Sequence, residues 1–398
     1  MMKRRAWIPC AFLIASSLAS GLCAQDEAVL YKAARVEPIS GPTLKPGQVL
    51  VVNGKIKALG NALSVPEGTE VVDLGDATLM PGLVNAYDET GLAGGSNEVT
   101  LEVTPSFEAS SAIDWKSRGF VEAAASGTTT MAVSPGTENV ISGLSTVVKT
   151  GGAVDTRTLK DHAALLISLC SDPARRNNSR QRPDSIYVRQ PTNRMGVVWI
   201  LRHTFDSVKR QPAEADAWLK TSLDGERPVF AVARTMHDLT TLLTLSDELG
   251  FSPIAVGGHE ADQVKELLAA AKVPVILEPI SASSLTGPER TTLIWNQAGV
   301  LHEAGIEVAL SGRSLLEQAR FAHRFGLPAK VALEAVTQTP ARLLRVADRV
   351  GSLAPGMDAD MIALDGDPLE FTTAIRWVMV NGTILERQKG ESRGSYDL

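Results

Sequence analysis

Several side chains that could do acid–base chemistry follow short apolar runs of the kind that form β-strands. Asp88 and Glu89 come shortly after the apolar pair Leu83-Val84, and His259 comes after Pro253 to Val256 and two glycines. Two carboxylates and a histidine can serve as general acid and general base. The three residues are therefore a candidate catalytic set. The alternative is that both carboxylates are solvated loop residues and that the histidine makes local hydrogen bonds.

A second set of residues could bind a small molecule. Glu278 follows the apolar run Pro274 to Leu277, Arg313 follows Ala309-Leu310, and Tyr87 precedes the two carboxylates. A guanidinium with a carboxylate could recognise an anionic or zwitterionic ligand. Equally, Glu278 and Arg313 could pair with each other across a cavity. Tyr87, Glu278 and Arg313 are thus candidate ligand-binding residues.

The histidines give no sign of a chelating pair. The chain has six, at positions 162, 203, 237, 259, 302 and 323, so no two of them stand at a short ligand spacing. The spacings of H-E-x-x-H sites and of cysteine/histidine zinc fingers are absent as well. The residues alone therefore predict no common zinc motif.

Composition and charge describe a globular protein. The chain has 398 residues, of which 44% are apolar and 21% are charged, and its net charge is −6. This is enough for one large barrel domain and a smaller second domain. Acidic and basic residues are interspersed, so no basic stripe is available for a phosphate backbone. We therefore expect no nucleic-acid partner.

The first residues have the pattern of an export signal. Lys3, Arg4 and Arg5 form a basic end, residues 8–22 are mostly apolar, and cleavage is expected after Ala24. We predict an exported protein, periplasmic or extracellular, with no membrane span after cleavage. Cys170 would then be the one cysteine of the mature chain, which excludes an intrachain disulfide.

Two kinds of secondary structure are expected along the chain. Strand-like runs at Val29 to Val36, Gln48 to Asn53, Lys55 to Leu59 and Glu70 to Asp73 indicate a small antiparallel sheet. Similar runs near the end occupy Met361 to Leu364, Ile375 to Val380 and Thr383 to Glu386, with an Asn381-Gly382 hairpin turn. Between these ends, strands alternate with helices, as in Pro228 to Val232, His237 to Leu249 and Pro253 to Val256. This alternation predicts parallel βαβ units, with a closed eight-fold barrel favoured over an open doubly wound sheet. Residues 175–194 are expected to form a long loop.

Two segments that bracket the barrel resemble the amidohydrolase superfamily, in its imidazolonepropionase-like branch. Leu79 to Ala86 is similar to that family's entry into the first barrel strand. Val350 to Asp360, Asp365 to Pro368 and Val380 to Gly382 are similar to its return from the barrel to a β-domain. The resemblance implies an α/β fold, a TIM-like (β/α)8 barrel with a small composite β-sandwich built from both ends of the chain. The implied boundaries are 1–24 for the signal, 25–80 and 346–398 for the β-sandwich, and 81–345 for the barrel.

The resemblance also implies a divalent metal whose ligands this chain mostly lacks. Where the family has His-x-His the chain has Tyr87-Asp88-Glu89, and where it has a strand-five histidine the chain has Ala231-Val232-Ala233. His259 matches the strand-six position, while Ser311-Gly312-Arg313 stands where an aspartate is expected after strand eight. A phenol binds metal poorly at neutral pH because its ordinary pKa is about 10. We therefore expect no metal cofactor.

Three functions remain open at this point. The first is an exported amidohydrolase-like protein, by resemblance a hydrolase of non-peptide C–N bonds, that is catalytically silent or remodelled. The second is a metal-independent hydrolase that uses Asp88, Glu89 and His259. The third is a metallohydrolase with the unusual ligands Glu89, His259 and Glu278, which would suit manganese or magnesium. The expected partner is an unknown small molecule, with a homo-oligomer or an intact amidohydrolase paralogue as further candidates.

Overall fold

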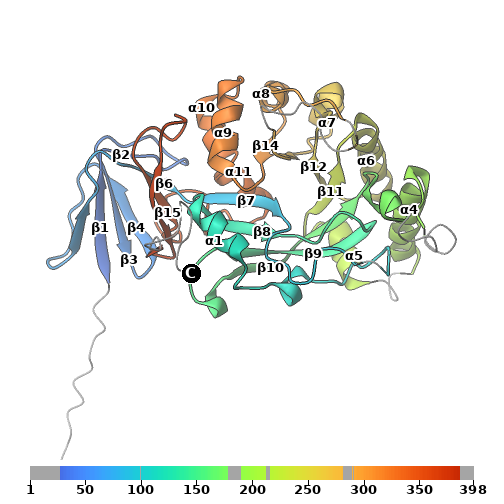
Figure 1. The fold of residues 1–398 in the computed structure, drawn as a ribbon, viewed down its shortest axis with the longest axis horizontal. Helices are drawn as coiled ribbons and strands as arrows, with labels where there is room; N and C mark the ends of the chain where they lie inside the picture. The colour runs from blue at the N-terminus through green and yellow to red at the C-terminus, as the bar shows by residue number, and fades with distance from the viewer. Residues whose placement is uncertain are drawn as a thin grey trace, which may run out of the picture.

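The computed structural model describes residues 27–98, 100–177, 190–211, 216–280, 289 and 291–385. The predicted export signal lies outside these residues, as do residues 178–189 of the predicted loop and Glu386 of the predicted last strand. Figure 1 shows a β-rich part beside a larger α/β part, with β6 and β7 leading from one into the other. No helix within the described ranges is both long and apolar enough to cross a membrane.

The larger part is a nearly closed barrel of eight strands, which confirms the predicted fold class. The strands are neighbours in the order β14, β13, β12, β11, β10, β9, β8, β7. Their bounds are Leu83–Asp88 (β7), Thr128–Val133 (β8), Ile141–Lys149 (β9), Thr158–Ser168 (β10), Val229–Ala233 (β11), Pro253–Gly257 (β12), Val275–Leu277 (β13) and Val308–Leu310 (β14).

One barrel strand differs from the predicted parallel pattern. Strand β9 runs antiparallel to both β8 and β10, whereas the other neighbouring strands are parallel. The connections on either side of β9, residues 134–140 and 150–157, contain no α-helix. A parallel pair needs a crossover of about a dozen residues or more, so connections this short favour an antiparallel strand.

The barrel closes through the turn between α10 (Ala329–Glu334) and α11 (Gln338–Leu343) rather than through a strand pair. The backbone N–H of Val84 on β7 donates to the carbonyl of Val336, and that of Leu310 on β14 donates to Ala335. Residues 335–336, just before α11, therefore lie between the first and last strands. Because the mouth of a barrel gathers the loops after the strand ends, residues far apart in the sequence meet there.

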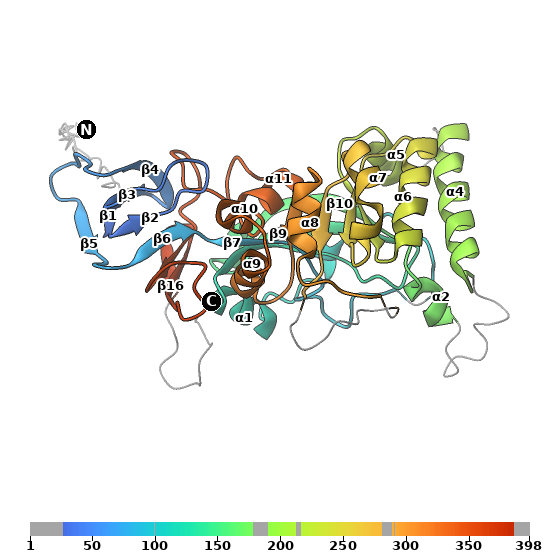
Figure 2. The same ribbon diagram turned by 90° about the horizontal axis from the view of Figure 1, so that it is seen from above.

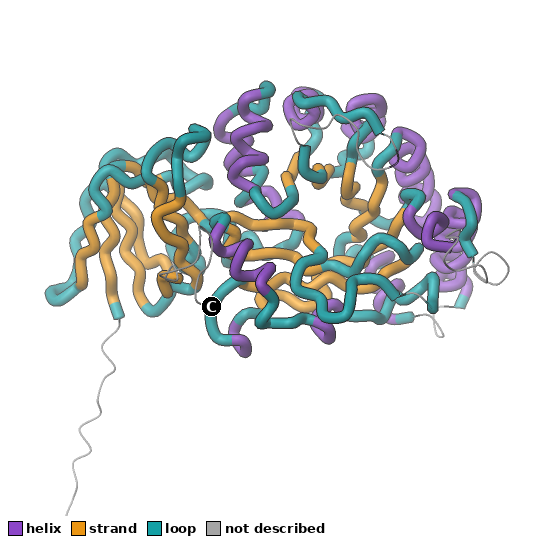
Figure 3. The backbone as a smooth tube through the Cα atoms, viewed as in Figure 1, coloured by secondary structure: helices purple, strands orange, loops and turns teal. Residues whose placement is uncertain are grey.

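Helices cover the barrel unevenly. Figure 2 shows α4, α6, α7 and α8 side by side, and in Figure 3 the longer helices form an arc over the strands β11 to β14. The helices are η1 (Ala109–Ala112), α1 (Arg118–Ala125), η2 (Val154–Thr156), α2 (Asp172–Asn177), α4 (Arg194–Arg210), α5 (Ala217–Leu223), α6 (Met236–Leu249), η3 (Ala261–Val264), α7 (Lys265–Ala270), α8 (Gln297–Glu303), α9 (Leu315–Arg324), α10 (Ala329–Glu334) and α11 (Gln338–Leu343). Residues 175–177 and 194, predicted as loop, are helical because α2 and α4 extend over them.

The β-rich part contains two sheets. Strands β1 (Ala28–Ala33), β3 (Gly47–Val52), β4 (Lys55–Gly60) and β5 (Glu70–Asp73) form a sheet of N-terminal strands alone. It is mixed rather than antiparallel, since β1 and β5 are parallel. The second sheet combines β2 (Arg35–Val36) and β6 (Thr78–Pro81) with β15 (Met361–Leu364), β16 (Ile375–Val380) and β17 (Thr383–Leu385), so both ends of the chain share it.

The Asn381-Gly382 turn forms as its sequence predicts. Both residues have positive φ, 50° and 81°, and they join the antiparallel strands β16 and β17. Asparagine and glycine tolerate this left-handed conformation better than other residues, which is why the pair marks tight hairpins. The turn thus adds β17 as an edge strand to the sheet in which β15 pairs with β6.

Alternation along the barrel strands separates two apolar clusters. Side chains such as Val84, Phe230, Val232 and Val256 fill the inside of the barrel, while Leu165, Val229 and Ala231 belong to the cluster with the surrounding helices. Successive strand residues point to opposite faces, so this division follows directly from the strand geometry. Beyond the strand ends the same alternation points polar side chains into the mouth.

Candidate functional site at the barrel mouth

Arg234 stands at the centre of the mouth, on the short loop between β11 and α6. A capping box fixes this loop: the hydroxyl of Thr235 accepts from the backbone of Asp238, whose carboxylate accepts from the backbone of Thr235 and of Arg234. Such reciprocal caps satisfy backbone donors at the start of a helix. The loop therefore holds the side chain of Arg234 toward the mouth, two residues beyond the inward-facing Val232.

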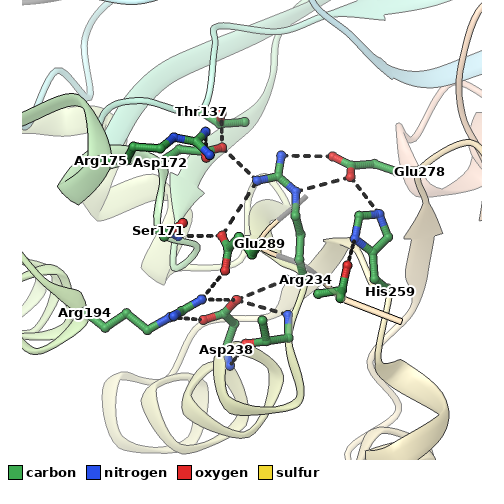
Figure 4. Close-up of polar contacts among 12 residues, drawn as sticks. Thr137, Ser171, Asp172, Arg175, Arg194, Arg234, Asp238, His259, Glu278 and Glu289 are labelled. Carbon is green, nitrogen blue, oxygen red and sulfur yellow. Dashed lines mark hydrogen bonds and ion pairs between the residues drawn. The ribbon is translucent and has the colours of Figure 1, made fainter. Parts of the chain in front are cut away.

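The guanidinium of Arg234 binds two carboxylates from other elements (Figure 4). Its Nε and Nη2 each donate to Glu278 at 3.2 Å, and its Nη1 donates to Asp172 at 2.7 Å. Arg234 is buried. Burial alone would lower the pKa of its guanidinium, but the charges of Glu278 and Asp172 raise it above its ordinary value. The cation is therefore permanent, and the bidentate contact fixes its orientation.

Glu278 and His259 form a pair beside Arg234. The His259 Nε2 atom lies 2.9 Å from Glu278 Oε2, and its Nδ1 lies 3.1 Å from the hydroxyl of Thr291. Burial would raise the pKa of Glu278, but His259 and Arg234 hold it at about 2. Glu278 is thus a carboxylate at neutral pH. Both ring nitrogens of His259 have protein partners, which leaves neither of them directed at a ligand.

Two glycines before His259 allow this close arrangement. Gly257 and Gly258 have φ values of +103° and +57°, and an added Cβ at Gly257 would lie 2.9 Å from Cγ of Arg234. A larger residue at 257 would force the arginine side chain to move. The turn thus brings His259 and Arg234 to the same point of the mouth.

A third group of acids lies on the other side of Arg234. Asp172 begins α2, and Glu289 accepts a 2.7 Å hydrogen bond from the backbone of Ser171 and also pairs with Arg194. Ligand atoms of Cys170, Asp172 and Glu289 all lie within 4.8 Å of one another. Burial raises the pKa of the Cys170 thiol well above its ordinary value, with the charge of Asp172 adding to the effect. The thiol is therefore protonated at neutral pH.

Tyr87 and Glu89 form a separate contact at the end of β7. The Tyr87 hydroxyl donates to Glu89 at 3.2 Å, and the Ser96 hydroxyl donates to the same carboxylate at 2.6 Å. Burial raises the pKa of Glu89 above its ordinary value, and it raises the pKa of Tyr87 well above its own. Asp88 instead accepts from Asn85 and from the backbone of Thr90, so its carboxylate caps the turn.

The structure corrects the predicted pairing of Arg313 with Glu278. The Arg313 side chain is 80% exposed and lies 3.9 Å from Glu122, while Glu278 binds Arg234 and His259. The physical reason is the left-handed turn at Gly312, with a φ of +113°, which ends the alternation of strand β14 before Arg313 is reached. Arg313 therefore lies outside the cluster around Arg234.

The positions where the resemblance implies metal ligands do not fit a divalent ion. Val232 is apolar, Tyr87 holds its proton, and His259 uses both ring nitrogens for Glu278 and Thr291. At Gly312 an added Cβ would lie 2.4 Å from Cγ of Pro279, so no carboxylate can be placed there without movement. A permanent guanidinium also occupies the centre of the mouth, where it repels a metal ion.

Sequence reasoning missed the residues at the centre of this cluster. Arg234 and Asp172 each follow an inward-facing residue by two positions, Val232 and Cys170, so the alternation of the strands gave a signal for both. Glu289 stands in a segment without a periodic pattern, and no local signal indicates its position. The alternation could have identified Arg234 and Asp172, but not Glu289.

One protein-family model matches the C-terminal part of the chain. Residues 232–386 match the model of the amidohydrolase family. The amidohydrolase tasK of Hapsidospora irregularis is 24% identical over 394 residues, which cover 85% of this chain and 39% of that protein. The chain therefore spans about two fifths of the length of this relative.

Solved structures share the fold over nearly the whole chain. An amidohydrolase from Thermotoga maritima MSB8 superimposes with a TM-score of 0.82 at 28% identity, covering 90% of this chain and all of that one. A prolidase in complex with N-methylphosphonate-L-proline has a TM-score of 0.57 at 16% identity, covering 91% of this chain and 100% of that one, and shows the fold alone.

Proposed function

We propose that this chain is an exported amidohydrolase-family protein that has lost metal-dependent hydrolysis. The family match over residues 232–386 and the likeness to the Thermotoga maritima amidohydrolase support the family part of this proposal. The observation that carries the proposal is the state of His259, the one residue that matches a family ligand position. Both of its ring nitrogens are within hydrogen-bonding distance of protein partners, Glu278 and Thr291. Metal-dependent hydrolysis needs an open coordination site with neutral imidazoles and carboxylates. The mouth supplies ion pairs instead.

We then expect the barrel mouth to bind a partner or to take part in assembly, and not to catalyse hydrolysis. Its buried carboxylates and guanidinium satisfy one another, so the cluster keeps its shape without a cofactor. A small molecule, a second copy of the chain, or an intact amidohydrolase paralogue is the proposed partner. Fold and chemistry are separable in this way because the chemistry resides in a few side chains.

A metal-independent hydrolase is the second candidate, and Glu89 is the observation that favours it. Burial raises the pKa of this carboxyl, which is how proteins prepare a general acid for work near neutral pH. Its neighbour Tyr87 could orient a substrate by hydrogen bonding. In this mechanism Glu89 rather than His259 would deliver the proton to the leaving nitrogen.

Elemental analysis of protein purified without chelators tests the main proposal. We expect far less than one equivalent of zinc, manganese, iron or nickel per chain. We also expect no turnover of amides, ureas or cyclic imides in added zinc or manganese. Stoichiometric metal together with turnover that a chelator abolishes would contradict the proposal. Turnover that is insensitive to chelators but lost in Glu89→Gln would establish the second candidate.

The proposed export is tested by a separate measurement. Intact-mass analysis of the protein from its native host should show a chain that begins near Gln25, since the basic and apolar start ends there. Full-length protein recovered from the cytoplasm would contradict export and leave the other proposals unaffected.

A further inference from the structure

The acids of the barrel mouth need a buried cation, and one residue supplies it. Glu278 and Asp172 have side chains that are 17% and 5% exposed, and Glu289 is 5% exposed. Buried carboxylates that lack a cation are costly. The side chains of Arg175 and Arg194 contact this group from its edge and are 67% and 44% exposed. Within the described residues, Arg234 is the buried cation of the cluster, since its side chain is 8% exposed.

We propose that the guanidinium of Arg234 takes the place of a divalent ion in this mouth and blocks a cation site formed by Cys170, Asp172 and Glu289. This inference rests on the proposed loss of metal-dependent hydrolysis. Arg234 joins the ends of β10, β11 and β13 by binding Asp172 and Glu278, and its Nη1 lies 4.0 Å from Glu289. A metal ion bound at a barrel mouth likewise connects the ends of several strands.

The blocked site has the dimensions of a coordination shell. The ligand atoms of Cys170, Asp172 and Glu289 lie within 4.8 Å of one another. Zinc forms bonds of about 2.0–2.3 Å to sulfur and oxygen, so ligand atoms around one ion lie at most a little over 4 Å apart. The three side chains could therefore close around an ion after small rotations. Glu278, on the far side of Arg234, would be a further acid nearby.

Guanidinium and metal ion exclude each other at this point. Arg234 already pairs with Asp172, one of the three side chains that would have to bind the ion. An approaching dication would meet a permanent positive charge a hydrogen bond away from its ligands. Removing the guanidinium takes this positive charge away from Asp172 and opens the space it occupied, while Arg175 and Arg194 stay at the edge of the group.

Substitution of Arg234 tests the inference directly. The Arg234→Ala variant should bind one zinc ion per chain in calorimetric titration, at least tenfold more tightly than the wild type. Arg234→Lys is the matched control, since it keeps a cation and should bind no better than the wild type. Zinc should raise the unfolding temperature of Arg234→Ala and leave that of the wild type unchanged.

Cobalt(II) identifies the ligands in the same variant, because a bond between cobalt and a thiolate absorbs in the near ultraviolet. We expect this absorption in Arg234→Ala and its loss in Arg234→Ala/Cys170→Ser. A variant that folds only when zinc is supplied also supports the inference. Should Arg234→Ala stay unfolded with zinc, Arg234→Gln replaces it, and a folded Arg234→Gln that takes up no zinc or cobalt overturns the inference.

The two proposals can fail separately. A metal-free wild type whose Arg234 variants bind no ion overturns this inference and leaves the loss of metal-dependent hydrolysis standing. A wild type that contains catalytic metal elsewhere in the mouth overturns the proposed function. In that case, an additional ion in Arg234→Ala would still support the role of the guanidinium.

Discussion

Two regions of this molecule place a buried cation between carboxylates. At the barrel mouth, Arg234 lies between Glu278 and Asp172. At the junction with the β-rich part, Lys149 of β9 lies 3.0 Å from Asp358 and also contacts Asp360, just before β15. Each cluster joins segments that are far apart in the sequence.

The two clusters differ in their balance of charge and in their access to solvent. At the junction the side chains of Lys149 and Asp358 are 1% and 2% exposed, and Asp358 also pairs with Lys55 and Arg349. Among the described residues of the mouth, Arg234 is buried beside Asp172, Glu289 and Glu278, and the side chain of Glu278 is 17% exposed. Because both acids of the junction are sealed from solvent, we expect that cluster to serve the stability of the fold. At the mouth a partly exposed acid lets an ion from solution approach, which is what the proposed cation site requires.

The largest effect is expected at the junction. Lys149→Met leaves two buried carboxylates without their shared cation, and breaking a buried ion pair in this way costs about 3–5 kcal/mol. Lys55→Met is the matched control, because Lys55 binds the same Asp358 from a half-exposed position and should cost at most about 1 kcal/mol. Urea unfolding of both variants measures the difference. Equal losses would mean that the junction is not the sealed cluster described above.

The contribution of the mouth to the free energy of unfolding should fall at acid pH. The pKa of Glu278 is about 2 in the folded protein against 4.5 as its ordinary value, so the folded state binds this proton less readily. The resulting stabilisation is fully present above pH 4.5 and is lost as the pH falls toward 2. The shift corresponds to roughly 3 kcal/mol. Glu278→Gln, which resembles the protonated side chain, should therefore differ from the wild type by a free energy that shrinks over this range.

Urea unfolding of wild type and Glu278→Gln at several pH values between 7 and 2 measures this gap. Asp88→Asn serves as the control, since Asp88 lies at the same mouth but binds neither Arg234 nor His259 among the described contacts. A gap for Glu278→Gln that stays constant with pH would show that its ion pairs contribute nothing to stability.

The smallest effect is expected for Arg313, which the sequence placed at the site. Arg313→Ala removes a side chain that is 80% exposed and whose nearest acid, Glu122, is 3.9 Å away. Surface changes of this kind alter stability by less than about 0.5 kcal/mol. Thermal unfolding and zinc titration should both match the wild type. A large loss of stability would mean that Arg313 belongs to the mouth after all.

The pattern of the sequence predicted most of the fold because the signals are local. Strands β5, β15 and β16 have the predicted bounds, and the Asn381-Gly382 turn forms as expected, since apolar alternation and turn residues act over a few positions. The direction of β9 was missed because its buried residues have the same pattern in a parallel and an antiparallel strand. Short flanking connections, rather than the strand itself, set its direction.

By itself the sequence predicted the barrel and its flanking sheets, and it has Tyr87, Glu89, Val232 and Gly312 where the resemblance implies histidines and an aspartate. Only the tertiary structure decided which charges meet at the mouth. Arg234 binds Glu278 and Asp172, which are 44 and 62 residues away along the chain. Arg313, the partner that the sequence suggested for Glu278, is exposed to solvent instead. Strand alternation fixes the side of the sheet on which a side chain lies. Its partners depend on the register and curvature of the closed barrel, which no local pattern encodes.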